Sequence, residues 1–345
     1  MKKTLNFELV RTIVAISLAI MLAIIIIFCV SNQPINAIYK LFIGPFTNIR
    51  YLRDIVKLMI PLIFTGLSVL FMFRTKLFNL STEGGFYAGA LIASVIAILC
   101  PLPSIVHPII IMFVAILVGG LVAFIPTILK LKFDANEVVS SLMLNYIIFY
   151  FGDFILKKYL QDKSVAHVTS LKFNQTALLP KVWSDIHLGI VIGIVLIIVS
   201  YIFLYKTRWG LMIRITGENN NFAKYSGINV FKIIVLAQCL GGAIAGLGGA
   251  VHIIGSSQRF NFAWRSGYGF DGIIIAIIAR YNPKYVVVST FILAYLRVGS
   301  DIMSRTTDVQ NEVVAIIQGV IIILIASVGF LENYKKKLLL KEVTN

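Results

Sequence analysis

The chain has 345 residues, of which 59% are hydrophobic and 13% are charged, and its mean hydropathy is +0.91. This leaves too little polar surface to cover a soluble globule of this size, so the composition excludes a soluble domain and predicts a membrane protein in contact with lipid. The formal net charge is +16. We attribute that charge to cytoplasmic loops near anionic lipid and expect no nucleic-acid partner, because no groove of basic and aromatic residues is visible.

About ten apolar segments are candidates for membrane-spanning helices, since a run of about 20 apolar residues crosses a hydrocarbon core roughly 30 Å thick. The stronger candidates are Thr12–Val30, Leu188–Tyr205, Ile233–Ile254 and Val313–Phe330. The weaker ones are Leu58–Phe73, Phe86–Leu102, Ser104–Leu129, Val138–Gly152, Phe270–Ala279 and Tyr285–Leu296, several of them short or interrupted by proline, asparagine or charge. The expected fold class is therefore all-α, a polytopic membrane protein with one transmembrane domain over residues 1–345.

The distribution of lysine and arginine predicts the orientation, because cytoplasmic loops near span ends hold an excess of both. With an even number of spans and the N-terminus inside, both termini are cytoplasmic. A cytoplasmic loop is then expected at about 206–232 and a large external loop at about 154–187.

Motifs of catalysis and metal binding are missing from the sequence. No G-x-x-x-x-G-K-[ST] loop is present, and His107, His167, His187 and His252 are scattered without a second ligand at the spacing that metal sites need. We therefore expect no catalytic residue, no metal site and no cofactor in this chain. A nucleophile and base that meet only in space are not excluded by this argument.

A glycine-rich run, Gly241–Ala250, lies inside one of the stronger spans. Gly242, Gly246 and Ala250 are four residues apart and so share one helix face, where small side chains allow a neighbouring helix to approach closely. The run therefore predicts tight helix packing rather than a phosphate loop.

Polar residues within or beside the spans are candidates for the translocation pathway. An ionisable side chain in mid-bilayer costs about 2.5–3.5 kcal/mol on insertion scales, so such residues usually face a cavity or a partner. The candidates are Asn79, Glu83, Glu137, Asn145 and Asp271. A structural explanation stays open beside this one: Asn79 and Glu83 would cap a helix, Glu137 would lie at the interface, and Asn145 would bond between helices.

The segment Gly217–Asn229 is a polar island of helix-sized length between two apolar runs. Asn219 can accept hydrogen bonds from the first free N–H groups, Glu218 suits the positive end of the helix dipole, and Gly227 can take the left-handed conformation that ends a helix. So short a helix is marginal by itself and needs a surface to dock against. The docking side chains would be Phe222, Ala223 and Tyr225. The alternative is a simple surface loop.

Four motifs in sequence carry a resemblance to a known family. They are Phe78-Asn79-x-x-x-Glu83-Gly84, Asn136 through Tyr146, Gly217 through Ile228, and Gly267-Tyr268-Gly269-Phe270-Asp271-Gly272 with Asn282-Pro283 after it. Together they resemble the permeases of ABC importers of the ribose and branched-chain amino acid type, and most of all the nucleoside branch. The resemblance covers about Pro61 to Ser327.

The resemblance implies one half of a transmembrane pathway in a prokaryotic plasma membrane. The expected partners are a cytoplasmic ATPase that holds ATP and Mg, a second permease that is a homologue or a copy, an external solute-binding lipoprotein, and membrane lipid. By this resemblance, the polar island is the helix that couples to the ATPase. The residues expected to take part are Gly217, Glu218, Asn219, Phe222, Ala223, Tyr225 and Gly227. In the family its first positions often read Asn-Pro-Glu-Ala, whereas here Asn219 is followed by Asn220, Asn221 and Phe222.

The resemblance implies nucleosides as the solute, with simple sugars as the alternative. A less favoured alternative from another class is an ion-coupled secondary transporter, which would use Asp271, Glu83 or Arg280 as coupling charges.

Overall fold

The computed structural model describes residues 21–22, 24–165, 168–261 and 266–310, together with residues 313, 316 and 319. The chain divides into two compact units, which are described separately below. The first consists of Met1–Ile55 and Phe291–Asn345, and the second is Val56–Thr290. All residues predicted for coupling or for the pathway belong to the second unit.

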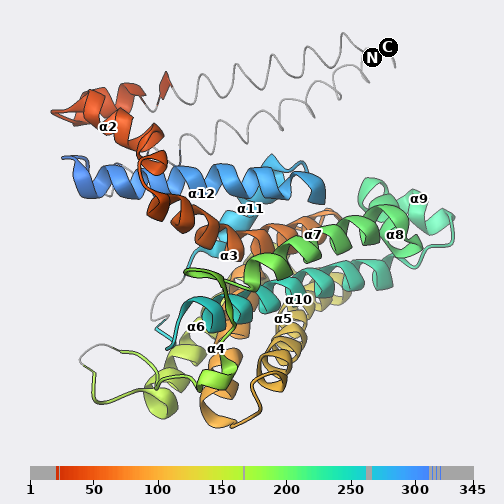
Figure 1. Cartoon of the computed structure of the whole chain (residues 1–345). Coiled ribbons are helices and arrows are strands. Elements are labelled where there is room, and N and C mark those ends of the chain that lie inside the picture. The colour runs from red at the N-terminus through yellow and green to blue at the C-terminus, as the bar shows by residue number, and fades with distance from the viewer. Residues whose placement is uncertain are drawn as a thin grey trace, which may run out of the picture. The chain divides into compact units, whose positions relative to one another are not determined.

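Helices dominate the described residues (Figure 1). In chain order they are α2 (Pro34–Phe42), the 3-10 turn η1 (Gly44–Phe46), α3 (Ile49–Phe73), α4 (Thr82–Leu99), α5 (Val106–Phe133), α6 (Glu137–Ile155), the π-helical turn η2 (Leu156–Leu160), the 3-10 turn η3 (Gln175–Ala177), α7 (Gly189–Lys206), α8 (Arg208–Glu218), α9 (Asn220–Tyr225), α10 (Val230–Ser256), α11 (Tyr268–Ile278) and α12 (Pro283–Thr306). Two short strands, β1 (Lys181–Trp183) and β2 (Ile186–His187), pair antiparallel.

Among the described residues, seven helices are long and apolar enough to cross a membrane. They are α3, α4, α5, α6 with η2, α7, α10 and α12. The all-α, polytopic membrane class is therefore confirmed. Most of the predicted spans Thr12–Val30 and Val313–Phe330 lies outside the described residues, so the number of about ten crossings stays a prediction.

One predicted span agrees with its helix in length, and another is shorter than the helix that contains it. Phe270–Ala279 corresponds to α11, which has 11 residues and so reaches only about 16 Å, half of a hydrocarbon core. A membrane crossing at this segment stays a prediction. The span predicted to begin at Leu58 begins at Ile49 instead, because Arg50, Arg53 and Asp54 interrupt the apolar pattern without interrupting the helix.

The second unit is centred on α10, which packs against α4 and α5. Its glycines bring backbone against backbone: a Cβ at Gly242 would collide with the Gly119 carbonyl of α5, and one at Gly246 with the Ala115 carbonyl. A Cβ at Gly249 would collide with the Phe86 carbonyl of α4. The predicted role of the glycine run in close helix packing is confirmed.

The first unit has a small buried core, formed by Ile27, Ala37, Leu41, Leu296, Met303 and Val309. Hydrogen bonds join the segment before α2 to the segment after α12. The Asp308 carboxylate accepts them from Ser31 Oγ and from Asn32 N, both at 2.6 Å. Tyr295 Oη also donates to the Phe42 carbonyl.

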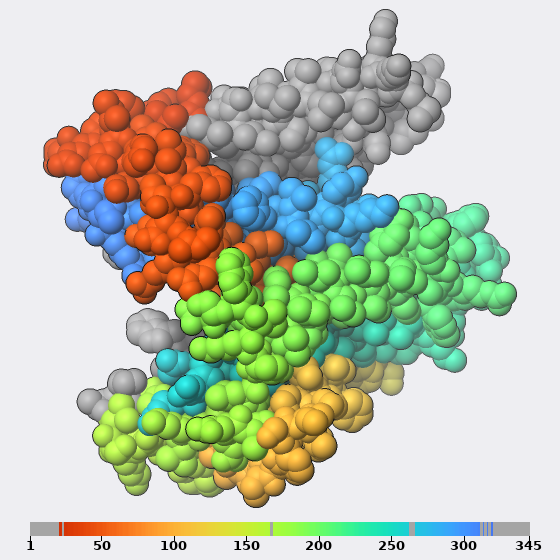
Figure 2. Space-filling model, in the orientation of Figure 1, coloured from red at the N-terminus to blue at the C-terminus, as the bar shows by residue number. Residues whose placement is uncertain are grey.

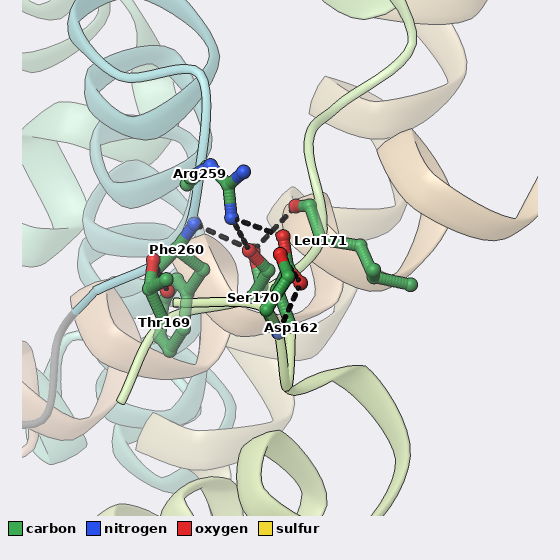
Figure 3. Close-up of polar contacts among 7 residues, drawn as sticks. Asp162, Thr169, Ser170, Leu171, Arg259 and Phe260 are labelled. Carbon is green, nitrogen blue, oxygen red and sulfur yellow. Dashed lines mark hydrogen bonds and ion pairs between the residues drawn. The ribbon is translucent and has the colours of Figure 1, made fainter. Parts of the chain in front are cut away.

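The segment predicted as a large external loop contains the β1–β2 hairpin, which the sequence analysis did not predict. Backbone bonds tie it to the segment after α10, from Phe173 N to Gln258 O and from Ser170 N to Phe260 O, each at 2.9 Å. Side chains join the same two segments (Figure 3). Arg259 donates to Asp162 at 2.7 Å and to the Ser170 carbonyl at 3.0 Å.

Asp162 is held ionised at this junction. Hydrogen bonds from Ser164, and then from Arg259, lower the pKa of the Asp162 carboxyl to about 2. Its folded-state pKa lies below the ordinary value, so the stabilisation is present above the unfolded pKa and is lost only as the pH falls towards 2. The junction between the loop and the end of α10 therefore persists across the physiological pH range.

Two adjacent glycines of α5 test the close packing of α10. A Cβ at Gly119 would meet Gly242 and Gly246 backbone atoms, whereas a Cβ at Gly120 has its nearest neighbour, the Cys239 carbonyl, at 3.5 Å. Gly119→Ala should destabilise the purified protein by about 1–3 kcal/mol through overpacking. Gly120→Ala, the matched control, should be neutral or stabilising by up to about 1 kcal/mol, because alanine is the better helix former. Thermal unfolding in detergent measures both, and equal behaviour would contradict the packing described.

Candidate functional site

The chain between α3 and α4 turns back into the helix bundle. Thr82, the first residue of α4, lies beside Ser68 of α3, with their hydroxyl oxygens 3.1 Å apart. Ser68 precedes the end of α3 by more than a turn, so the start of α4 lies alongside α3. Of the non-helical residues between the two helices, Leu77, Asn79 and Ser81 are buried, whereas Lys76 and Phe78 are exposed. Non-helical backbone at this depth is tolerated only where protein groups satisfy its N–H and C=O groups. Four side chains, Asn79, Glu83, Ser141 and Asn145, do so here, and we call them the bracket.

Asn79 attaches this segment to α5. Its side chain is fully buried, and its Nδ2 donates to the Ala123 carbonyl at 3.2 Å and to Thr127 Oγ1 at 3.4 Å. Its Oδ1 accepts a hydrogen bond from Ser81 N at 3.0 Å, just before α4 begins. One amide therefore closes the turn and links two helices.

Asn145 and Ser141 attach the same segment to α6. Asn145 Nδ2 donates to the Leu80 carbonyl at 2.9 Å, and Asn145 Oδ1 accepts from Gly84 N at 3.0 Å. Ser141 Oγ, one turn earlier on α6, accepts from Leu80 N at 3.0 Å. Both backbone groups of Leu80 are thus satisfied by α6 side chains.

Glu83 joins the start of α4 to the start of α11. Its carboxylate is buried and accepts hydrogen bonds from Gly267 N at 2.9 Å and Gly269 N at 2.6 Å, with Ser266 Oγ at 3.3 Å. Gly267 has a φ of +73°, a conformation that glycine adopts without strain. The carboxylate lies in the first turn of one helix and accepts hydrogen bonds from free N–H groups at the start of another.

The two other predicted pathway residues lie outside the bracket. Glu137 is in the first turn of α6, with its Oε2 3.5 Å from Lys130 Nζ. Asp271 is buried in the first turn of α11. The structure thus brings together Asn79, Glu83 and Asn145, in the capping and helix-linking contacts that the structural explanation describes. Their part in translocation stays a prediction.

Ser141, Gly267 and Gly269 belong to this site and were not among the predicted site residues. Two signals in the sequence could have indicated them: Ser141 is four residues from Asn145 and so shares its helix face, and a Gly-x-Gly pair directly before an apolar helix marks an unusual backbone.

The predicted cytoplasmic loop at 206–232 contains two helices, α8 and α9. Thr207 Oγ1 accepts a hydrogen bond from Gly210 N at 3.1 Å at the start of α8. Asn219 accepts from Asn221 N and Phe222 N, at 2.9 and 3.0 Å, and so caps α9. Gly227 has a φ of +77°. Both predicted ends of the short helix are confirmed.

The side chains of α9 divide between the interior of the chain and the solvent. Tyr225 is 93% exposed and Phe222 is 59% exposed, whereas Ala223 is fully buried. The methyl group of Ala223 is covered within the chain, which leaves Phe222 and Tyr225 as exposed aromatic side chains of α9. The coupling role of these three residues stays a prediction. Figures 1 and 2 show α8 and α9 at a projecting end of the second unit.

Two further predicted residues, Gly217 and Glu218, lie at the end of α8. A Cβ at Gly217 would collide with the Arg74 carbonyl, and the Glu218 carbonyl accepts a hydrogen bond from Lys76 Nζ at 3.0 Å. Glu218 is the last residue of α8 and not part of the first turn of α9. These contacts attach the α8–α9 corner to the segment that follows α3.

Comparison with known proteins decides the family. The model of the family described as "Branched-chain amino acid transport system / permease component" matches residues 51–326. The chain belongs to this permease family. It is 31% identical over 311 residues to the guanosine ABC transporter permease protein NupP of Bacillus subtilis, covering 88% of each chain.

Two other relatives cover similar lengths. The nucleoside ABC transporter permease protein NupB of Lactococcus lactis is 28% identical over 327 residues, or 91% of this chain and 89% of the relative. The glucose ABC transporter permease protein TsgB13 of Haloferax volcanii is 28% identical over 315 residues, or 88% of this chain and 83% of the relative. The protein is thus a permease subunit of an ABC importer, a transport subunit and not an enzyme.

Asn145→Leu tests whether the bracket is structural. The substitution keeps the volume but leaves the Leu80 carbonyl and Gly84 N without their partners, which should cost about 1–3 kcal/mol. We expect a lower yield and melting temperature of the assembled complex, with the solute preference of the surviving complex unchanged. Met143→Leu, at a 63% exposed position of the same helix, is the control and should change neither. Normal stability with an altered solute preference would place Asn145 in the pathway instead.

Proposed function

We propose that the chain forms, with a second permease, the transmembrane pathway of an ABC importer for nucleosides. The observation that carries this proposal is the family membership together with the relatives named as nucleoside and guanosine permeases. The second permease is a homologue or a copy, and an external solute-binding lipoprotein delivers the solute. The complex lies in the plasma membrane of a prokaryote, with both termini of this chain in the cytoplasm.

In this proposal α9 is the helix on which the ATPase acts. A helix of 6 residues is marginal alone, yet this one is capped at its start by Asn219 and closed at its end by Gly227. It presents Phe222 and Tyr225 to solvent, where large aromatic side chains are typical of a docking surface rather than of a free loop.

The cycle that follows is alternating access. ATP binding closes the ATPase pair, the docked α9 helices move, and the two permeases open outward to receive the solute; hydrolysis returns them to the inward-open state. ATP and Mg are held by the ATPase, and the permease performs no chemistry on the solute.

A second candidate solute is a simple sugar. The observation that favours it is the 28% identity to the permease named for glucose. The ion-coupled alternative loses its support, because the family is one of ABC permeases. Within the structure, the Glu83 carboxylate is also held by two backbone N–H groups.

Competition for uptake distinguishes the two solutes. Cells that express the complete transporter should accumulate labelled guanosine, and excess unlabelled adenosine should reduce the uptake while excess ribose or glucose should not. A strain that lacks this chain but retains the partner subunits gives the background. Uptake that sugars abolish and nucleosides leave unchanged would assign the transporter to sugars.

Substitutions on α9 test the coupling role. Tyr225→Ala removes the most exposed aromatic contact, and Gly227→Val places a β-branched residue at a φ of +77°, which is strongly disfavoured. Both variants should still insert, while uptake and solute-stimulated ATP hydrolysis fall together by at least about tenfold. Ser226→Ala, an exposed neighbour, is the control. Wild-type uptake in both variants would show that α9 is not the coupling helix.

A further inference from the structure

Two tyrosines and two cations form a continuous row between three helices of the second unit. Tyr201 and Tyr205 lie one turn apart at the end of α7, and their rings stack with centroids 5.1 Å apart and an interplanar angle of 29°. The Arg214 guanidinium of α8 lies 4.9 Å from the centroid of Tyr205, and Lys284 Nζ of α12 lies 4.4 Å from that of Tyr201. We call these four residues the ladder.

The contacts of the ladder are attractive and partly shielded from water. A cation over an aromatic face is attracted by the quadrupole of the ring, and the attraction grows as the pair is desolvated. Both tyrosines and Arg214 are only partly exposed. Arg214 Nε is buried and forms no hydrogen bond with any described residue, so the Tyr205 ring is the contact that holds this side of the guanidinium.

One end of the ladder is attached to the coupling helix. Arg214 lies in α8, and only Asn219 separates α8 from α9. The α8–α9 corner is compact, since the Glu218 carbonyl accepts a hydrogen bond from Lys76 and Ala223 is fully buried. A displacement of α9 therefore carries α8 and Arg214 with it.

The other end is attached to a strained turn. Lys284 lies in the first turn of α12, three residues after Tyr281. Arg280 and Tyr281 have φ angles of 51° and 54°. Two successive residues other than glycine in the left-handed region are costly, and they persist only where surrounding contacts hold them. Here Tyr281 N donates to the Ala276 carbonyl at 2.9 Å, and the Tyr281 ring lies 6.5 Å from that of Phe73.

We propose that the ladder transmits the displacement of α9 to α12, with Tyr201 and Tyr205 as positioning residues for transport. This inference rests on the proposed coupling role of α9. The turn before α12 belongs to the end of α11, and Glu83 of the bracket holds the start of α11. The ladder thus gives a route of side-chain contacts from α9, through α12 and α11, to the bracket.

Paired spin labels on the complete transporter test this route. Lys224→Cys reports on α9, and Val288→Cys, 57% exposed, reports on α12; each is paired with Phe133→Cys, 72% exposed at the end of α5. Trapping with ATP and vanadate should change both distances in the otherwise unaltered chain. A ladder variant should retain the change at α9 and lose at least about half of the change at α12.

Three substitutions separate transmission from a merely structural role. Tyr205→Leu removes the ring and should uncouple α12, whereas Tyr205→Phe keeps the ring and should behave as the parent does. Lys284→Gln removes one cation at an exposed position and should uncouple α12 without altering the core, so it carries the test if Tyr205→Leu fails to assemble. Tyr285→Leu, at a 54% exposed neighbour outside the ladder, is the matched control and should have no effect.

Guanosine uptake gives an independent measurement. Uncoupled variants should hydrolyse about fivefold more ATP per solute transported. A full change at α12 in both Tyr205→Leu and Lys284→Gln would overturn the ladder alone. The absence of any ATP-driven change at Lys224 in the parent would overturn the coupling role of α9, and the ladder with it.

Discussion

The interior of a membrane offers no water, so each buried backbone N–H and C=O must find its partner inside the protein. Helices satisfy this requirement along their length. Where the backbone of this chain is not helical, polar side chains supply the missing partners. The segment before α4 and the segment before α11 are two such places. Asn79, Asn145 and Glu83 supply their missing partners. Polar residues that are expensive to bury thus support the irregular backbone that the fold contains.

The same constraint explains the glycines of α10. Because lipid is as apolar as the side chains, burial alone does not drive helices together in a membrane, and close contact between backbones contributes instead. Gly242, Gly246 and Gly249 permit that contact with α5 and α4 on different faces of one helix. With α10 held so closely, the bracket and the α8–α9 corner are both attached to a dense centre.

Side chains and a glycine also stabilise the ends of α9 and the junction between the long loop and the segment after α10. Asn219 and Gly227 close a helix too short to persist alone, and Asp162 with Arg259 fixes the long loop against the segment after α10. The exposed aromatic side chains Phe222 and Tyr225 then lie on a well-defined helix rather than on a free loop. In the proposed coupling role such a helix would transmit a displacement that a flexible loop would absorb.

The sequence by itself determined the class, the family and the ends of α9, because these depend on composition, on ordered motifs and on local capping by Asn219 and Gly227. It also predicted the close packing at Gly242 and Gly246, since the spacing of small residues is a local property. Only the tertiary structure decided that Asn145 faces Leu80 and Gly84, that Glu83 caps α11, and that Ala223 is buried. Those contacts join residues far apart in the chain, and α3 is likewise longer than the apolar run that predicted it. Hydropathy measures the preference of a segment for lipid, whereas the length of a helix and the partner of a polar side chain depend on which other helices surround it.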